Sequence, residues 1–109
     1  MPRKAVWITY DLGIKGDYEG MYSFLDRHNA KECGDSVAFL NFDFSVDIIS
    51  EFTDAIRESV DLDKRSRVYL VYPDPEAKGY KGRFILGTRK SPPWAGFGMT
   101  GAAEEDVGE

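Results

Sequence analysis

Two helical stripes set between short apolar strands predict an α+β fold for this chain of 109 residues. In the stripes apolar residues recur every three or four positions, whereas in the strands they tend to alternate in period two. The segments follow one another as strand, helix, two strands, helix and two strands. This order predicts a ferredoxin-like antiparallel sheet (β-α-β-β-α-β) with both helices on one face and an extra C-terminal strand.

The first half of the chain supplies the first four segments. Residues 5–10 form an apolar, β-favouring run and predict a buried strand. A helical stripe follows, with Asp17 placed as its N-cap and Asn29, which tolerates the left-handed conformation, at its end. Residues 31–33 and 36–44 then predict a short and a longer strand joined by a tight turn.

A second helix is expected after these strands, with Ser45 as its cap. Its apolar residues lie on one stripe, while most of its acidic residues lie off that stripe, as in a helix that covers a core. The residues of the stripe are Ile48, Ile49, Phe52, Ile56 and Val60.

The last two strands are expected over residues 67–72 and 81–88. Pro73 is expected to stop the first of them, because proline has no backbone N–H to donate within a sheet. Strict alternation in the second would place Phe84 and Leu86 on the same face.

Length and composition predict one domain over residues 1–97, followed by a flexible acidic tail over 98–109. The sequence shows no apolar run of membrane-spanning length and no signal-peptide core. Its single cysteine, Cys33, allows no internal disulfide. We therefore expect a cytoplasmic domain that does not bind membranes.

Charge is distributed unevenly along the chain. Residues 1–63 hold 6 basic and 13 acidic side chains, whereas residues 64–90 hold 8 basic and 2 acidic ones. Aromatic residues are interleaved with the basic ones, and this combination favours a surface for phosphates and bases. The alternative is a sheet edge that its charges protect against wrong pairing. The candidate nucleic-acid-binding residues are Lys78, Lys81, Arg83, Arg89, Lys90 and Trp94.

Asp11, Asp17 and Glu19 form an acidic cluster at the predicted end of the first strand, where functional sites gather on a rigid scaffold. Carboxylates suit magnesium or manganese. The alternative is that Asp17 caps the helix, Glu19 faces solvent and Asp11 satisfies the backbone of the turn. The glycines of this loop match neither the dinucleotide fingerprint nor the Walker A spacing.

Three short motifs carry a resemblance to a known family: Tyr10-Asp11-Leu12, Ser36-Val37-Ala38-Phe39 and Arg67-Val68-Tyr69-Leu70-Val71. With the order of segments, they resemble the small CRISPR-associated protein of spacer acquisition and its relatives, the virulence-associated D toxins. The resemblance implies a homodimer in which Asp11 lies near the dimer axis and, with its twin, holds magnesium or manganese. The loop over residues 12–19 departs from the family pattern, because it is acidic where the family tends to be basic.

Three functional hypotheses remain open. The first, which rests mainly on the resemblance, is a small dimeric adaptor or regulator in a prokaryotic nucleic-acid-related system, such as mobile-element defence or a toxin–antitoxin pair. The second is a metal-dependent nuclease that uses Asp11 across the dimer axis. The third is a regulator whose acidic helices and tail bind a basic protein partner. In addition, the extended segment over residues 92–97 is expected to contact a second protomer.

Overall fold

The computed structural model describes residues 3–74, 76 and 78–99. Over these residues the fold is α+β, as the sequence predicts. The elements are β1 (Arg3–Asp11), α1 (Tyr18–Arg27), β2 (Lys31–Glu32), β3 (Val37–Asp43), α2 (Ile48–Ser59), β4 (Arg67–Asp74), β5 (Gly79–Leu86) and a short 3₁₀ helix, η1 (Phe97–Met99).

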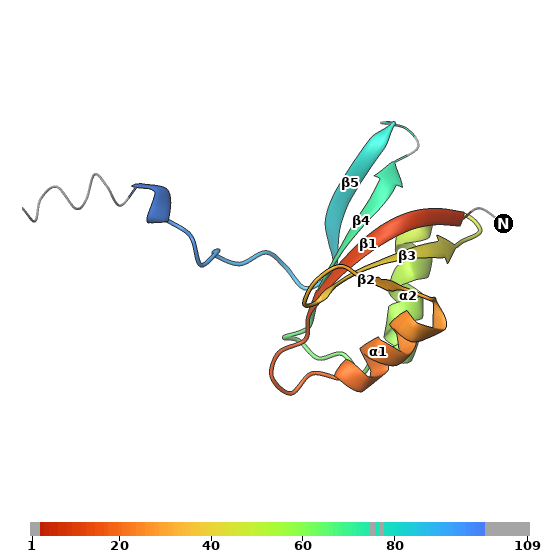
Figure 1. The fold of residues 1–109 in the computed structure, drawn as a ribbon, viewed down its shortest axis with the longest axis horizontal. Coiled ribbons are helices and arrows are strands. Elements are labelled where there is room, and N and C mark those ends of the chain that lie inside the picture. The colour runs from red at the N-terminus through yellow and green to blue at the C-terminus, as the bar shows by residue number, and fades with distance from the viewer. Residues whose placement is uncertain (1–2, 75, 77, 100–109) are drawn as a thin grey trace, which may run out of the picture.

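The strands form one antiparallel sheet in the order β2-β3-β1-β4-β5. The central strand β1 is paired with β3 on one side and with β4 on the other. Figure 1 shows both helices on the same side of this sheet. The opposite side of the sheet has no helix over it in the described part of the chain.

The core lies between the two helices and one face of the sheet. Val6 and Ile8 of β1 are fully buried, whereas Trp7 between them is only partly buried. Alternation along each strand therefore separates a core face from a second, accessible face. The remaining largest buried side chains are Phe24, Phe52, Leu12, Met21, Leu40, Ile56, Leu70 and Val68.

The helix caps agree with the sequence in one case and differ in the other. Asp17 caps α1 as predicted, because its carboxylate accepts a hydrogen bond from the backbone N–H of Gly20 at 2.9 Å. The cap of α2 is Asp47 and not Ser45, so that prediction was wrong. The N–H of Ser45 donates to the Glu51 carboxylate at 2.8 Å. Glu51 therefore fixes the segment before the helix, and the helix starts after this segment.

Pro73 does not end the strand that contains it, contrary to the prediction. It lies inside β4 opposite Tyr80, and β5 already begins at Gly79. The pairing of β1 with β4 extends only to Val71, so at Pro73 the strand has a neighbour on one side alone. Proline is tolerated at such a local edge, because no partner there requires its missing N–H.

The alternation expected for the last strand is also wrong, because β5 contains a bulge. Leu86 lies opposite Val68, whereas Phe84 lies opposite the next residue of β4, Tyr69. One extra residue, Ile85, is therefore inserted, and Phe84 and Leu86 lie on opposite faces. The bulge places Phe84 beside Tyr69 on the accessible face.

After β5 the chain leaves the body as an extended arm that ends in η1 (Figure 1). η1 includes Gly98 and Met99, which the sequence assigned to the flexible tail. The acidic positions of that tail lie within residues 100–109, outside the described residues. Among the described helices, neither α1 nor α2 is long and apolar enough to cross a membrane.

Candidate nucleic-acid interface

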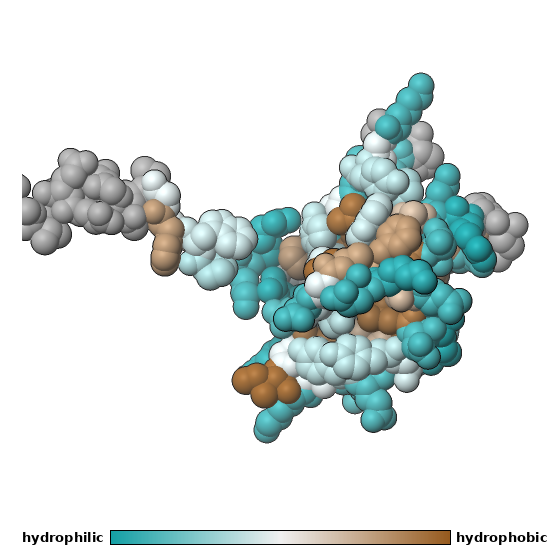
Figure 2. All heavy atoms as spheres, viewed as in Figure 1, coloured by the Kyte–Doolittle hydropathy of each residue, from teal (hydrophilic) through white to brown (hydrophobic). Residues whose placement is uncertain are grey.

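Five aromatic side chains from four strands share the side of the sheet that faces away from the helices. We call this surface the aromatic face. In Figure 2, pale and tan side chains lie at the surface in the region of β1 and β4, and tryptophan and tyrosine are pale on this hydropathy scale. The residues of the aromatic face are Trp7 of β1, Phe39 of β3, Tyr69 of β4, and Tyr80 and Phe84 of β5.

The rings of the aromatic face form two contact groups. The Trp7 ring lies 5.0 Å from the Phe39 ring and 5.6 Å from the Tyr80 ring, centroid to centroid. The Tyr69 and Phe84 rings meet edge to face at 4.9 Å. Tyr80 is 60% exposed, and the other four rings are partly exposed. The face therefore presents aromatic surface across β3, β1, β4 and β5.

Gly82 makes room for the Tyr69 ring. A Cβ atom at Gly82 would lie 2.4 Å from the Tyr69 hydroxyl and 2.6 Å from the ring. The absence of a side chain there lets the Tyr69 ring lie against the backbone of β5, next to Phe84. The position of this ring thus depends on a glycine in the neighbouring strand.

Arg89 adds a positive charge to the aromatic face. Its guanidinium carbon lies 5.5 Å from the centroid of the Phe84 ring and 6.0 Å from that of Tyr69, within the range of cation–π attraction. Gly87, with φ +77°, makes the turn that leads to Arg89, and a Cβ there would lie 2.8 Å from the carbonyl oxygen of Ser66. Among the described residues, ring faces are the only partners of this guanidinium, so its N–H groups remain available.

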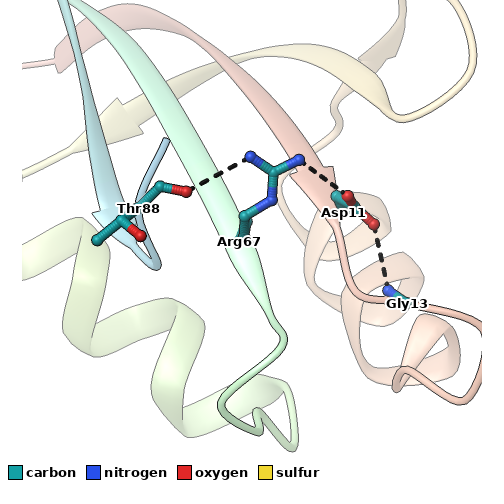
Figure 3. A network of polar contacts seen from close by, with 4 residues as sticks. All are labelled: Asp11, Gly13, Arg67 and Thr88. Carbon is teal, nitrogen blue, oxygen red and sulfur yellow. Dashed lines mark hydrogen bonds and ion pairs between the residues drawn. The ribbon is translucent and has the colours of Figure 1, made fainter. Parts of the chain in front are cut away.

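Arg67 is fixed at the same end of the face by two contacts (Figure 3). Its Nη2 lies 3.0 Å from Asp11 Oδ2, and its Nη1 donates to the carbonyl oxygen of Thr88 at 3.5 Å. Asp11 also accepts a hydrogen bond from the N–H of Gly13 at 3.3 Å. The hydrogen bond from Arg67 lowers the pKa of the Asp11 carboxyl below its usual value.

The three acidic residues of the predicted cluster have separate surroundings in the structure. The Asp17 carboxylate accepts hydrogen bonds from the N–H groups of Gly20 and of Asp61, at 2.9 and 2.8 Å, and Glu19 is exposed. Over the described ranges, no three His, Cys, Asp or Glu side chains are grouped so that they could hold a metal ion. Magnesium or manganese at Asp11 thus stays a prediction.

A hollow of about 470 Å³ opens at the Arg67 end of the aromatic face. This volume lies within the range of small-molecule sites. Residues from β1, β4, β5 and the turn before β3 line it, so its two sides come from opposite parts of the sheet. The lining residues with polar or aromatic chemistry include Asp11, Asp35, Ser36, Arg67, Tyr69, Phe84 and Arg89.

The register separates two of the predicted nucleic-acid-binding residues from the aromatic face. Lys81 and Arg83 lie opposite Tyr72 and Leu70, and so belong to the helix side of β5. Both side chains are exposed, and Lys81 Nζ forms an ion pair with Asp74 Oδ2 at 2.9 Å. They therefore form part of a different surface from Arg89.

The other four predicted residues lie in β5's flanking segments. Lys78 is in the turn before β5, with φ 55°, and Arg89 and Lys90 follow the strand. Trp94 lies on the extended arm and is 71% exposed. Of the six predicted residues, Arg89 is the one whose side chain contacts rings of the aromatic face.

Sequence reasoning missed Trp7, Phe39, Tyr69 and Arg67 as members of the site. Their signal was present, because each occupies the non-core parity of an alternating strand. Alternation within one strand does not show which strands are neighbours. The strand order is what brings the four side chains together.

Comparisons of the chain with protein-family models, curated proteins and solved structures gave no match. The resemblance to the spacer-acquisition family therefore stays a prediction. Functional inference for this chain rests on the chemistry of the aromatic face.

Proposed function

We propose that this chain is a small adaptor that binds single-stranded nucleic acid on its aromatic face. The observation that carries the proposal is the sharing of one helix-free sheet face by five aromatic rings and by Arg89. Aromatic rings stack on unpaired bases whatever the base, and guanidinium groups neutralise phosphates. Sheets with accessible aromatic residues are a recurring platform for single-stranded RNA.

Local charge supports this placement better than total charge does. The chain carries a net charge of −5, which disfavours non-specific attraction to a polyanion. Arg89, however, lies at one end of the aromatic face and Lys90 follows it in the chain, while Arg67 at the same end is paired with Asp11. The acidic residues of α1 and α2 belong to the opposite side of the sheet. A strand on the aromatic face therefore lies away from the acidic helices.

The proposal includes a ferredoxin-like fold extended by β5. Two features support this class: the element order β1-α1-β2-β3-α2-β4, and the place of β1 between β3 and β4 with antiparallel neighbours. A cytoplasmic location is a further part of the proposal.

The adaptor is proposed to act as a homodimer through its arm. Trp94 and Phe97 are each 71% exposed on a segment that projects from the body, as Figure 2 also shows. Large apolar side chains in such a position favour burial against a partner, and a second copy is the commonest one.

A fluorescence titration tests the proposed function directly. Trp94→Phe leaves Trp7 as the only tryptophan, so its emission reports on the aromatic face. We expect single-stranded oligonucleotides to quench Trp7, because a base stacked on the indole ring quenches its excited state by direct contact. Tyr69→Ala should weaken the binding of a labelled oligonucleotide about tenfold, since stacking on one aromatic ring contributes roughly 1 to 3 kcal/mol.

The matched control is Tyr22→Ala, which removes an exposed tyrosine from α1, on the helix side. It should leave the affinity unchanged. Equal losses for the two variants, or the absence of any binding to single-stranded RNA or DNA at low salt, would contradict the proposal.

A further inference from the structure

The hollow at the end of the aromatic face is chemically polarised. On its β4–β5 side stand Arg89 and the Tyr69 and Phe84 rings, and on its β3 side stands Asp35. Because β3 and β5 are three strand spacings apart, these sides are separated by roughly 14 Å. A ligand that spans the hollow therefore meets a cation and ring faces at one end and a carboxylate at the other.

Asp35 is free to accept hydrogen bonds from a ligand. No described residue donates a hydrogen bond to its carboxylate, and the residue is exposed. The turn that carries Asp35 is nevertheless held in place, because the N–H of Tyr10 donates to the carbonyl oxygen of Ser36 at 3.1 Å. Ser36 itself has φ 64°, a conformation that a non-glycine residue adopts at some cost. Asp35 therefore lines the hollow from a turn whose backbone is held in place.

We infer that this hollow binds one guanine nucleotide of the bound strand. The inference rests on the proposed function and adds a base preference to it. The nucleotide phosphate lies at Arg89, because the carboxylates of Asp11 and Asp35 repel it from the opposite side. Arg89 then turns from the ring faces toward the phosphate, and the base takes its place on the Tyr69 ring, because Phe84 stands edge to face with Tyr69 and only one of the two rings can stack on a flat base. The outer edge of the base is directed toward Asp35.

The carboxylate of Asp35 selects guanine over the other bases. Guanine presents two adjacent donors on its Watson–Crick edge, N1–H and the 2-amino group, and one carboxylate can accept from both. Adenine and cytosine offer the amino donor beside an acceptor nitrogen, and uracil offers N3–H between two carbonyl groups. An acceptor that faces a carboxylate is repelled, so only guanine pairs both of its donors with Asp35.

Titrations with mononucleotides test the preference for guanine. The readout is calorimetry, or the fluorescence of Trp7 or of the tyrosines. We expect GMP to bind about tenfold more tightly than AMP, because two hydrogen bonds to one carboxylate discriminate between bases to about this extent. IMP, which lacks the 2-amino group, should fall between them. Guanosine should bind more weakly than GMP, because it has no phosphate for Arg89.

Two variants separate the two ends of the site. Asp35→Asn should abolish the preference for GMP over AMP, because an amide offers only one acceptor. Its matched control is Asp54→Asn, an exposed aspartate on α2 that loses the same charge elsewhere. Arg89→Ala should weaken the binding of GMP and of AMP by the same factor, which leaves the ratio of the two affinities unchanged.

The outcomes distinguish the inference from the proposed function. Equal binding of GMP and AMP, together with tight binding of an oligonucleotide, would overturn the guanine site and leave the aromatic face as a general stacking surface. A preference for GMP that survives in Asp35→Asn would overturn the assigned role of Asp35. Failure of every nucleotide and every oligonucleotide to bind would overturn both.

Discussion

Asp11 at the end of β1 and Arg67 at the start of β4 form an ion pair, with 3.0 Å between Oδ2 and Nη2. The pair joins two neighbouring strands, and both of its residues line the hollow. The hydrogen bond from Arg67 also keeps the pKa of Asp11 low, so Asp11 is ionised at neutral pH. A carboxylate held in this way has a structural partner already, which favours a positioning role over metal-dependent catalysis.

Substitution of Asp11 tests the nuclease hypothesis. We expect neither the wild-type chain nor Asp11→Asn to cleave RNA or DNA in the presence of magnesium or manganese. Thermal stability should fall only slightly, because half of the Asp11 side chain is exposed and such ion pairs contribute little. Gel assays of labelled oligonucleotides measure the cleavage. Metal-dependent cleavage that is lost in Asp11→Asn would establish the nuclease hypothesis instead.

Asp17 should make the stability of the domain depend on acid pH. The hydrogen bond from the N–H of Asp61, followed by that from Gly20, lowers the pKa of the Asp17 carboxyl. Its contribution is therefore complete above the unfolded-state pKa of about 4 and is lost as the pH falls through the lower folded-state pKa. In thermal melts, Asp17→Ala should lower the midpoint by about 5 °C at pH 7.

The difference in melting midpoint between Asp17→Ala and the wild type should shrink as the pH approaches 2. Protonation then removes from the wild-type carboxyl the charge that the variant already lacks. Asp54→Ala serves as the control, since this residue of α2 is exposed and its carboxylate accepts no hydrogen bond from the described residues. A difference in midpoint that stays constant from pH 7 to acid would contradict the assigned role of the charge.

Gly82→Ala should impair binding more than folding. The added Cβ collides with the outer atoms of the Tyr69 side chain, which can swing away. We expect a change in unfolding free energy below about 1 kcal/mol, as for most accessible positions. The affinity for single strands should fall about as much as in Tyr69→Ala, because the ring leaves its contact with Phe84. Denaturant titration and fluorescence anisotropy provide the two measurements, and unchanged affinity would contradict the assigned role of Tyr69.

Salt dependence should identify the face that contacts phosphates. Each neutralised phosphate of a single strand contributes about 0.7 to the slope of log affinity against log salt. Replacement of Arg89 and Lys90 by alanine should make the slope shallower by about 1.4 for every oligonucleotide sequence. Replacement of Lys81 and Arg83, on the helix side of β5, should leave it unchanged. The reverse result would move the interface to the helix side.

Assembly through the arm should be visible by sedimentation. We expect the wild-type chain to be a dimer at micromolar concentration and the double variant Trp94→Ala, Phe97→Ala to be a monomer, because both side chains are exposed in one copy. Val46→Ala, which shortens an apolar side chain that is 88% exposed just before the cap of α2, is the control and should remain dimeric. A wild-type monomer, or a double variant that still dimerises, would contradict arm-mediated assembly.

Local patterns in the sequence were sufficient for most elements of the fold. The Asp17 cap and the stripe with Ile48, Phe52 and Ile56 depend on contacts within a few residues, and the structure confirms them. The predicted cap at Ser45 failed for a local reason, because the Glu51 carboxylate accepts the N–H of Ser45. Two other predictions failed where a neighbouring strand decided the outcome. Pro73 continues β4 because the pairing of β4 with β1 stops at Val71, and the bulge at Ile85 follows from the pairing of β5 with β4.

The candidate site, too, could be predicted only in part from local patterns in the sequence. Alternation in the sequence marks Trp7, Phe39 and Tyr69 as residues off the core face, and the basic composition of residues 64–90 marks Arg89. Only the strand order brings them together, because hydrogen bonding between strands sets residues from distant parts of the chain about 5 Å apart. Composition by itself therefore determined which chemistry the chain carries, and the tertiary pairing decided that Arg89 joins the rings while Arg83 lies on the other side.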